Sequence, residues 1–133
     1  MKGFTELDAW KKSRILRNDI FELTKSFPGD EKYRLADQII RSSRSIGNNI
    51  AEGHGRFHYA DSSKFLINAC GSAAETIDHL IIALDQNYIS NEIFEKFKLQ
   101  LEECLKLING YINYLLKRVK TRKQQKTMWL LSK

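Results

Sequence analysis

The chain has 133 residues, of which 42% are hydrophobic and 29% are charged, and its formal net charge is +6. This length suits one compact domain, and this balance is typical of a globular chain rather than a disordered one. No segment approaches the roughly 18 consecutive apolar residues that a membrane-spanning helix needs. The first residues also lack the apolar core of a signal peptide, so we expect a cytoplasmic protein without a membrane span.

The positive charge is concentrated at the C-terminal end. Seven of the 22 basic residues lie between Lys117 and Lys133, a stretch that contains no acidic residue. The rest of the chain has 15 basic and 16 acidic residues and is therefore nearly neutral. We divide the chain accordingly into a predicted bundle domain, residues 1–116, and a predicted basic C-terminal tail, residues 117–133.

Apolar residues in the first 50 positions recur at helical spacing. The first set predicts an amphipathic helix that ends at the sequence FPGD, and it consists of Leu7, Trp10, Leu16, Ile20, Leu23 and Phe27. The second set predicts a helix with spacings of four, seven and four, and it consists of Leu35, Ile39, Ile46 and Ile50. Gly53 and Gly55 are natural places for this second helix to stop or bend.

Two further helices follow in the second half of the chain. The third is expected to begin near the sequence YADSSKF at Tyr59–Phe65, where Asp61, Ser62 or Ser63 can cap it, and to carry an apolar stripe from Phe65 to Leu84. The fourth can be capped by Ser90 or Asn91 and is expected to carry an apolar stripe that ends near Leu115. No segment alternates with the period of a strand. The sequence therefore predicts an all-α protein, an up-down antiparallel four-helix bundle.

The second helix carries an unusual polar stripe. At 100° per residue, its members fall between about 200° and 280° from Ile39; they are Gln38, Arg41, Ser45, Asn49, Glu52 and Arg56. The flanking positions are all small: Ser42, Ser43, Gly47 and Ala51. A merely solvated face is usually rich in Lys and Glu, whereas this stripe offers amides, a hydroxyl, a carboxylate and two guanidinium groups.

Two interpretations of the polar stripe remain open. In the first, the stripe is buried between helices or subunits, where Arg41 or Arg56 pairs with Glu52 or Glu75 and small residues allow close backbone approach. In the second, the stripe is a surface that contacts RNA or another protein. Under the first interpretation, the six residues of the polar stripe form a candidate subunit interface.

Several segments of the chain resemble a known bacterial family. They are LDAW at Leu7–Trp10, the stretch Phe27–Arg56, and KFLINACGSAAETIDHL at Lys64–Leu80. The shared motifs are Gln38-x-x-Arg41, Ser45-Ile46-x-x-Asn49-Ile50-Ala51-Glu52-Gly53, Gly55-Arg56 and Gly71-Ser72-x-x-Glu75. Together they resemble the four-helix bundle proteins called 23S rRNA intervening-sequence proteins, or S23-type proteins.

The resemblance extends from about Phe4 to Leu116 and carries expectations of its own. It implies an up-down bundle that assembles into a ring-like homo-oligomer, with a pentamer as the expected form, and it implies no known catalytic activity. Some members of the family are encoded inside insertions of the large ribosomal RNA gene, which motivates a link to RNA. The tail beyond Lys117 is not part of the shared pattern.

The tail contains the candidate nucleic-acid-binding residues. Their positive charges could neutralise phosphates, and they are Lys117, Arg118, Lys120, Arg122, Lys123 and Lys126. The alternative is a frayed, solvated helix end. The sequence MWLL at Met128–Leu131 suits docking on a neighbouring subunit, on a membrane surface or on a partner protein. The main function hypothesis is electrostatic RNA or DNA binding, and the competing hypothesis is a scaffold or adaptor that binds another protein.

Enzymatic chemistry has little support in the sequence. Gly53–Gly55 lacks the strand and the lysine of a phosphate-binding loop. His54 and His58 are four apart, but an intervening glycine and the expected helix end argue against a metal site, and His79 is expected to be a partly exposed helix residue. Cys70 and Cys104 lie in apolar patterns and are expected to be buried, reduced thiols. We therefore expect no catalytic residues, no metal and no cofactor.

Overall fold

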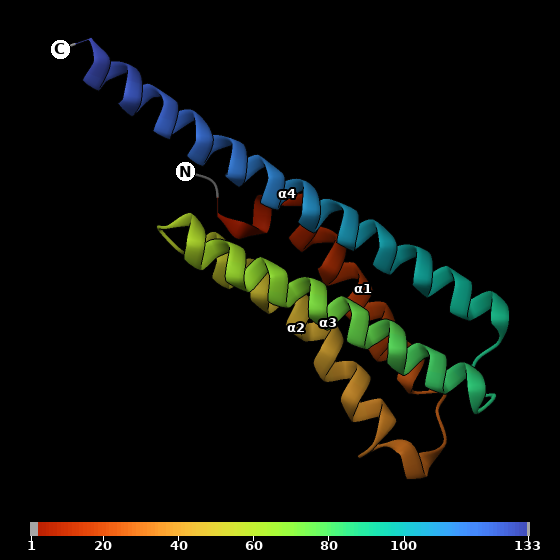
Figure 1. The fold of residues 1–133 in the computed structure, drawn as a ribbon. Coiled ribbons are helices and arrows are strands. Elements are labelled where there is room, and N and C mark those ends of the chain that lie inside the picture. The colour runs from red at the N-terminus through yellow and green to blue at the C-terminus, as the bar shows by residue number, and fades with distance from the viewer. Residues whose placement is uncertain (1–2, 133) are drawn as a thin grey trace.

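The computed structural model describes residues 3–132, and within them four α-helices form the antiparallel bundle that the sequence predicts (Figure 1). The helices are α1 at Asp8–Thr24, α2 at Leu35–His54, α3 at Tyr59–Asp85 and α4 at Asn91–Leu131, and short 3₁₀ turns lie at Phe4–Glu6 and Gly29–Glu31. Each helix packs against its neighbours in the chain, and α4 also packs against α1, which closes the bundle. No strand occurs among the described residues.

The bundle core consists of the apolar stripes that the helical spacing predicts. Every helix contributes side chains with almost no exposed surface, including Leu16, Ile20, Ile39, Ile46, Ile50, Leu66, Leu80, Leu101 and Ile108. Burial of each such side chain contributes about 1.5–3 kcal/mol relative to exposure. The bundle is therefore stabilised mainly by these four matched apolar faces rather than by its surface ion pairs.

The two cysteines differ in burial. Both are free; Cys104 is buried in the core, whereas Cys70 is half-buried. Burial raises the pKa of Cys104 to about 11, with Glu103 as the next cause, and burial also raises the pKa of Cys70. Both thiols are therefore protonated at neutral pH, so neither is an activated nucleophile.

The cap of α3 differs from the prediction, although the helix begins within the expected sequence YADSSKF. The helix begins at Tyr59, and its N-cap residue, His58, makes no capping hydrogen bond through its side chain. The expectation that Asp61, Ser62 or Ser63 caps the helix is therefore wrong. Ser62 is buried, and its hydroxyl donates to the backbone carbonyl of Arg56 at 3.3 Å, which holds the preceding loop against the helix.

The start of α4 agrees with the prediction. The hydroxyl of Ser90 accepts a hydrogen bond from the backbone N–H of Ile93 at 3.2 Å, as an N-cap serine should. Just before it, Asn87 has a φ of 63°, a left-handed conformation that asparagine adopts more readily than most residues. This turn reverses the chain between α3 and α4.

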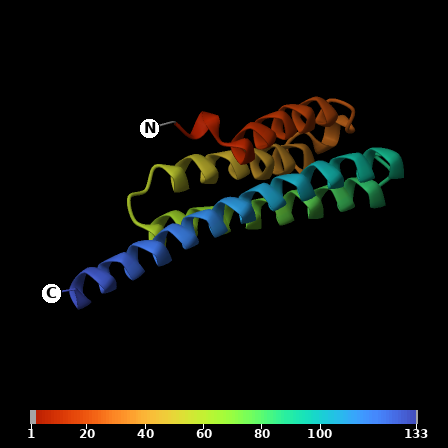
Figure 2. The ribbon, with the colours of Figure 1, turned by 90° about the horizontal axis from the view of Figure 1, so that it is seen from above.

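Helix α4 continues well beyond the end of its apolar stripe. It stays helical to Leu131 and projects past the ends of the other three helices (Figures 1 and 2). At a rise of 1.5 Å per residue, the stretch from Lys117 to Leu131 is about 22 Å long. We call this stretch the α4 extension. None of the helices within residues 3–132 combines the length and the apolar character needed to cross a membrane.

A small residue on α2 sets the spacing between α2 and α1. Gly47 is buried, and a Cβ atom placed on it would lie 2.9 Å from the hydroxyl oxygen of Ser13. That hydroxyl donates to the backbone carbonyl of Trp10 at 2.7 Å, so it is held in place. The next nearest atoms to the added Cβ would be 3.6 Å away, an ordinary contact. The Ser13 hydroxyl is therefore the specific obstacle to a larger residue at position 47.

We predict that Gly47→Ala lowers the free energy of unfolding by about 1 kcal/mol, because the steric clash outweighs the better helix propensity of alanine. In a Ser13→Ala background the same change should instead be stabilising, by about 0.5–1 kcal/mol, because the obstructing oxygen is gone. Urea unfolding of the wild type, both single variants and the double variant measures this coupling. Additive effects of the two substitutions would contradict this account of the contact.

Candidate functional site

The polar stripe of α2 separates into an inner and an outer part. Ser45 and Asn49 are half-buried against α3, whereas Gln38, Arg41, Glu52 and Arg56 are exposed. Of the six stripe residues, only Ser45 and Asn49 are therefore partly buried between helices of one chain. That the four outer residues contact another subunit remains a prediction.

The inner part forms a hydrogen-bonded contact with α3. The hydroxyls of Ser45 and Ser72 lie 2.8 Å apart, and the amide of Asn49 donates to the backbone carbonyl and the hydroxyl of Ser45. One turn earlier, the hydroxyl of Thr76 donates to the hydroxyl of Ser42 at 2.8 Å. Small hydroxyl side chains thus let α2 and α3 approach closely while their polar groups remain paired.

The outer part forms local ion pairs. Arg56 lies 3.2 Å from the carboxylate of Glu52, one of the pairings expected from the sequence, whereas Arg41 lies 3.3 Å from Asp37 rather than near Glu52 or Glu75. All four side chains are substantially exposed, at 45% or more of their surface. Exposed pairs of this kind on one helix contribute only about 0.3–0.5 kcal/mol.

The candidate nucleic-acid-binding residues all lie on the α4 extension. Each is exposed, and no acidic side chain of the described residues forms an ion pair with any of the six, which are Lys117, Arg118, Lys120, Arg122, Lys123 and Lys126. The exposed apolar end, Met128–Leu131, follows on the same helix. The extension therefore presents a concentrated positive charge away from the nearly neutral bundle.

The structure brings the end of the polar stripe and the start of the extension together. A cleft of about 450 Å³ lies between the α2–α3 loop and α4, and Arg56, Arg118 and Arg122 all line it. We call it the end cleft; its remaining lining residues are His54, Gly55, Phe57, Tyr59, Ser62, Tyr111, Leu115 and Val119. None of these residues is acidic. Two candidate sites that the sequence analysis treated separately thus share one cleft.

Aromatic side chains border the three arginines. Phe57 in the loop is 91% exposed. On α4 the rings of Tyr111 and Tyr114 are stacked at 6.4 Å, and the guanidinium of Arg118 lies over the Tyr114 ring and donates to its hydroxyl at 3.3 Å. Burial, and then the neighbouring Tyr114, raise the pKa of Tyr111, so its hydroxyl adds no negative charge to the cleft at neutral pH.

These aromatic residues were not predicted as part of a site. A signal for one of them was present, because Tyr111, together with Leu115, lies on the same line of α4 as Arg118 and Arg122, at spacings of four, three and four. The contribution of Phe57 and Tyr59 was not readable, because it depends on where the α2–α3 loop meets α4.

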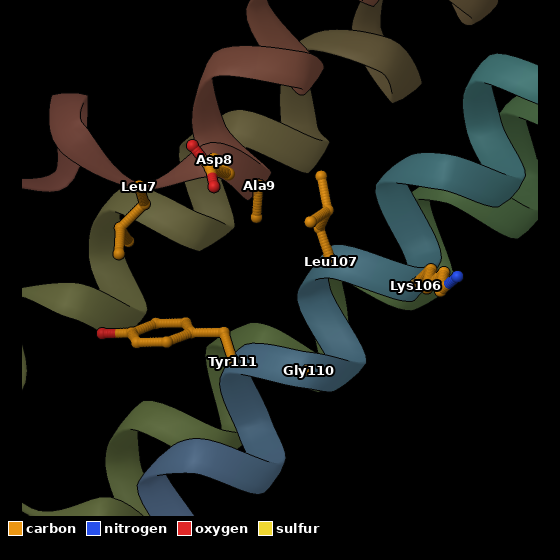
Figure 3. Close-up of a pocket in the computed structure, with 7 residues that line it drawn as sticks. All are labelled: Leu7, Asp8, Ala9, Lys106, Leu107, Gly110 and Tyr111. Atoms are coloured by element: carbon orange, nitrogen blue, oxygen red, sulfur yellow. The ribbon is translucent and has the colours of Figure 1, made fainter.

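A second cleft, of about 260 Å³, lies between the start of α1 and α4 and is mostly apolar (Figure 3). Leu7, Ala9, Leu107 and Tyr111 face it, whereas its two charged residues, Asp8 and Lys106, lie at the rim, with Lys106 directed away. The two charged groups do not converge, so this cleft offers no arrangement for acid–base catalysis.

His79 departs from the expectation of partial exposure, because it is buried against the bundle. Neither of its ring nitrogens has a hydrogen-bond partner among the described residues, and the carboxylate of Glu75 lies 3.7 Å from Nε2, beyond hydrogen-bond length. Within residues 3–132, no three His, Cys, Asp or Glu side chains group closely enough to hold a metal ion.

Comparison with known proteins identifies the family to which the chain belongs. The sequence pattern of the 23S rRNA-intervening sequence protein family matches residues 5–110. The chain belongs to this family. It is similar in structure to a protein of unknown function from the S23 ribosomal protein family of Bacteroides thetaiotaomicron, with 30% sequence identity and a TM-score of 0.73. That likeness covers 79% of this chain and 95% of the other. No curated protein matches the chain in sequence.

The family match ends before the basic residues of the α4 extension. The polar stripe of α2 lies inside the matched residues, whereas all six candidate nucleic-acid-binding residues lie beyond position 110. The end cleft therefore combines one arginine from the family region with two arginines from outside it.

We predict that Glu52→Ala changes the free energy of unfolding by less than about 0.5 kcal/mol, because its partner Arg56 remains hydrated when the carboxylate is removed. Thermal unfolding with van't Hoff analysis measures the change. A loss of about 1–3 kcal/mol would instead show that Arg56 is buried in a contact between subunits, where an unpaired charge is costly.

Proposed function

We propose that the protein is a non-enzymatic, self-assembling bundle that binds RNA, and by the same chemistry DNA, through the α4 extension. The observation that carries this proposal is the helical extension itself, which holds six exposed basic side chains outside the bundle and no acidic residue. Such a helix attracts a polyanion and releases its counterions on binding. Its lysines contact phosphates rather than base edges, so the binding is largely independent of sequence.

The family supports the choice of RNA as the polyanion. The matched family is described as 23S rRNA-intervening sequence proteins, and the similar solved structure is assigned to a ribosomal protein family. These descriptions concern the relatives, and the charge of the α4 extension is what connects them to this chain. The family match, residues 5–110, does not extend to the proposed binding element.

Self-assembly is supported by the surface of the bundle. Large aliphatic side chains are exposed on three helices, with Ile15 on α1 at 54%, Ile67 on α3 at 61% and Leu99 on α4 at 59%. Contact with a second copy would remove this apolar surface from water. In a ring-like homo-oligomer, with a pentamer as the proposed form, several extensions would act on one polyanion and weak contacts would combine by avidity.

A scaffold or adaptor that binds another protein is the second candidate. It is favoured by the apolar end of the extension, where Met128, Trp129, Leu130 and Leu131 are all more than half exposed. Four adjacent large apolar side chains on an exposed helical segment are suited to docking in a partner's groove. In this candidate function the basic residues confer solubility and no nucleic acid is bound.

We predict that cutting the chain after Leu116 abolishes most RNA affinity at low salt, because it changes the formal net charge from +6 to −1. The bundle should remain folded, because the buried core ends at Ile108. Filter binding at several salt concentrations measures both the affinity and the salt slope, which falls by roughly 0.7–0.9 for each lost phosphate contact. Equal affinity of both forms would place the site on Arg41–Arg56, and no affinity of either would favour the adaptor.

We predict that sedimentation velocity at micromolar concentration shows an assembly several times larger than the 15.5 kDa chain. The exposed aliphatic side chains on α1, α3 and α4 are the physical reason. The form truncated after Leu116 should assemble as well, since it retains those surfaces. A monomer of 15.5 kDa for the full chain would remove self-assembly from the proposal.

A further inference from the structure

We propose that the end cleft binds an unpaired segment of RNA, with phosphates on its arginines and a base on its exposed aromatic side chain. This inference rests on the proposed function, since it names the part of the protein that RNA occupies and the form of RNA that fits. The charge of the α4 extension alone would attract RNA diffusely, whereas the end cleft would hold one segment of it in a defined site.

Both arginines of the extension lie on the side of α4 that faces the end cleft. Arg118 and Arg122 line this cleft, whereas Lys120 and Lys123 lie about 100–160° away from them around the helix. Arginine presents a planar fork of donors that fits phosphate and also stacks on rings, whereas lysine acts as a hydrated point charge. The arginines thus occupy the positions where a ligand could be held in one geometry.

The third arginine comes from the other side of the cleft. Arg56 follows the end of α2, and its guanidinium lies 4.6 Å from the centre of the Phe65 ring as well as close to Glu52. A second hollow, of about 830 Å³, also borders Arg56, but Glu52 lines that one. The end cleft has no acidic lining residue, so an anion is attracted to the end cleft in preference.

Phe57 supplies a surface for stacking. Its ring is 91% exposed, which leaves a large apolar face in water at the edge of a cleft lined by arginines. Single-stranded nucleic acids bind to this combination, because a base stacks on the ring while neighbouring phosphates meet the cations. A cleft of about 450 Å³ also lies within the usual range for ligands of nucleotide size.

The geometry favours an unpaired strand over a duplex. In a duplex the base faces are stacked on one another and cannot reach Phe57. An unpaired strand can place one base on the ring and continue along α4, where Arg118, Arg122 and Lys126 follow one another at about 6 Å intervals along one side of the helix. The site is therefore expected to select unpaired RNA but to discriminate weakly among bases.

Phe57→Ala in the full-length chain is the first test, with a fluorescein-labelled mixed-sequence RNA 12-mer as the probe and anisotropy as the readout. We expect a roughly 5- to 100-fold loss of affinity, in the range of one base–aromatic stack, with no change in salt slope because no charge is removed. Tyr33→Ala is the matched control, since Tyr33 is 85% exposed but lies at the opposite end of α2. It should bind like the wild type.

The arginines are tested by a pair of charge-matched double variants. Arg118→Gln with Arg122→Gln and Lys120→Gln with Lys123→Gln each remove two positive charges from the same two turns of α4. If the cleft binds the strand, the arginine variant should lose at least 10-fold more affinity than the lysine variant. Annealing the 12-mer to its complement should weaken binding to the wild type, and polyglutamate should compete poorly.

The outcomes separate this inference from the proposed function. Equal losses in both double variants, with Phe57→Ala unchanged, would refute the cleft and leave diffuse electrostatic binding in place. Equal or tighter binding of the duplex, or equal competition by polyglutamate, would also refute it, the latter favouring an acidic protein segment as the occupant. Absence of RNA binding by the wild type would refute both.

Discussion

The close approach of α2 and α3 near their shared loop is the constraint on which the rest of the structure depends. Gly53 is buried there, and a Cβ atom on it would lie 3.1 Å from both the Leu66 side chain and the Ser62 backbone oxygen. A larger residue would force a backbone atom to move, and backbone cannot yield as a side chain end can. Ser62 in turn holds the carbonyl of Arg56. The helix contact thus fixes the loop, and the loop fixes Arg56 and Phe57 at the edge of the end cleft.

Helix α4 is the second determinant of that cleft. The residues on the side of α4 that faces the bundle change from buried apolar side chains to arginines where the bundle ends. Cys104 and Ile108 are buried on this side, Leu115 is half-buried, and Arg122 follows in the cleft. Within the bundle this side is stabilised by burial. Beyond it most side chains of α4 are exposed, and the like charges at i, i+3 and i+4 repel, which weakens this part of the helix. Neutralisation of its charges by a polyanion would therefore stabilise the helix and bind the ligand through the same contacts.

The fold was predictable because burial of one helix face makes apolar residues recur at helical spacing. Features that depend on contacts between distant parts of the sequence were not predictable. The apolar stripes correctly predicted four helices, and Ser90 is one of the two residues expected to cap the fourth. The predicted cap of α3 was wrong because Ser62 bonds to the preceding loop rather than to its own helix end, and His79 was expected to be partly exposed although packing buries it. Helical angles gave the direction of the polar stripe but not its depth, so half-buried Asn49 and exposed Gln38 looked alike. The end cleft joins residues 54–62, in the middle of the chain, with residues 111–122 near its C-terminal end, and no local sequence pattern predicts that contact.

In the proposed function, the separation of charge along the chain would couple RNA binding to assembly. The bundle region is nearly neutral, so copies of it can meet without strong repulsion, whereas each extension carries nearly all of the excess positive charge. In the proposed ring, the extensions repel one another, and this repulsion opposes assembly when no anion is present. RNA that spans several extensions removes the repulsion and is itself bound by several sites. This coupling is reciprocal: if bound RNA favours assembly by a given free energy, assembly favours RNA binding by the same free energy. A uniformly basic chain would lack this coupling, because the repulsion would act within the subunit contacts themselves.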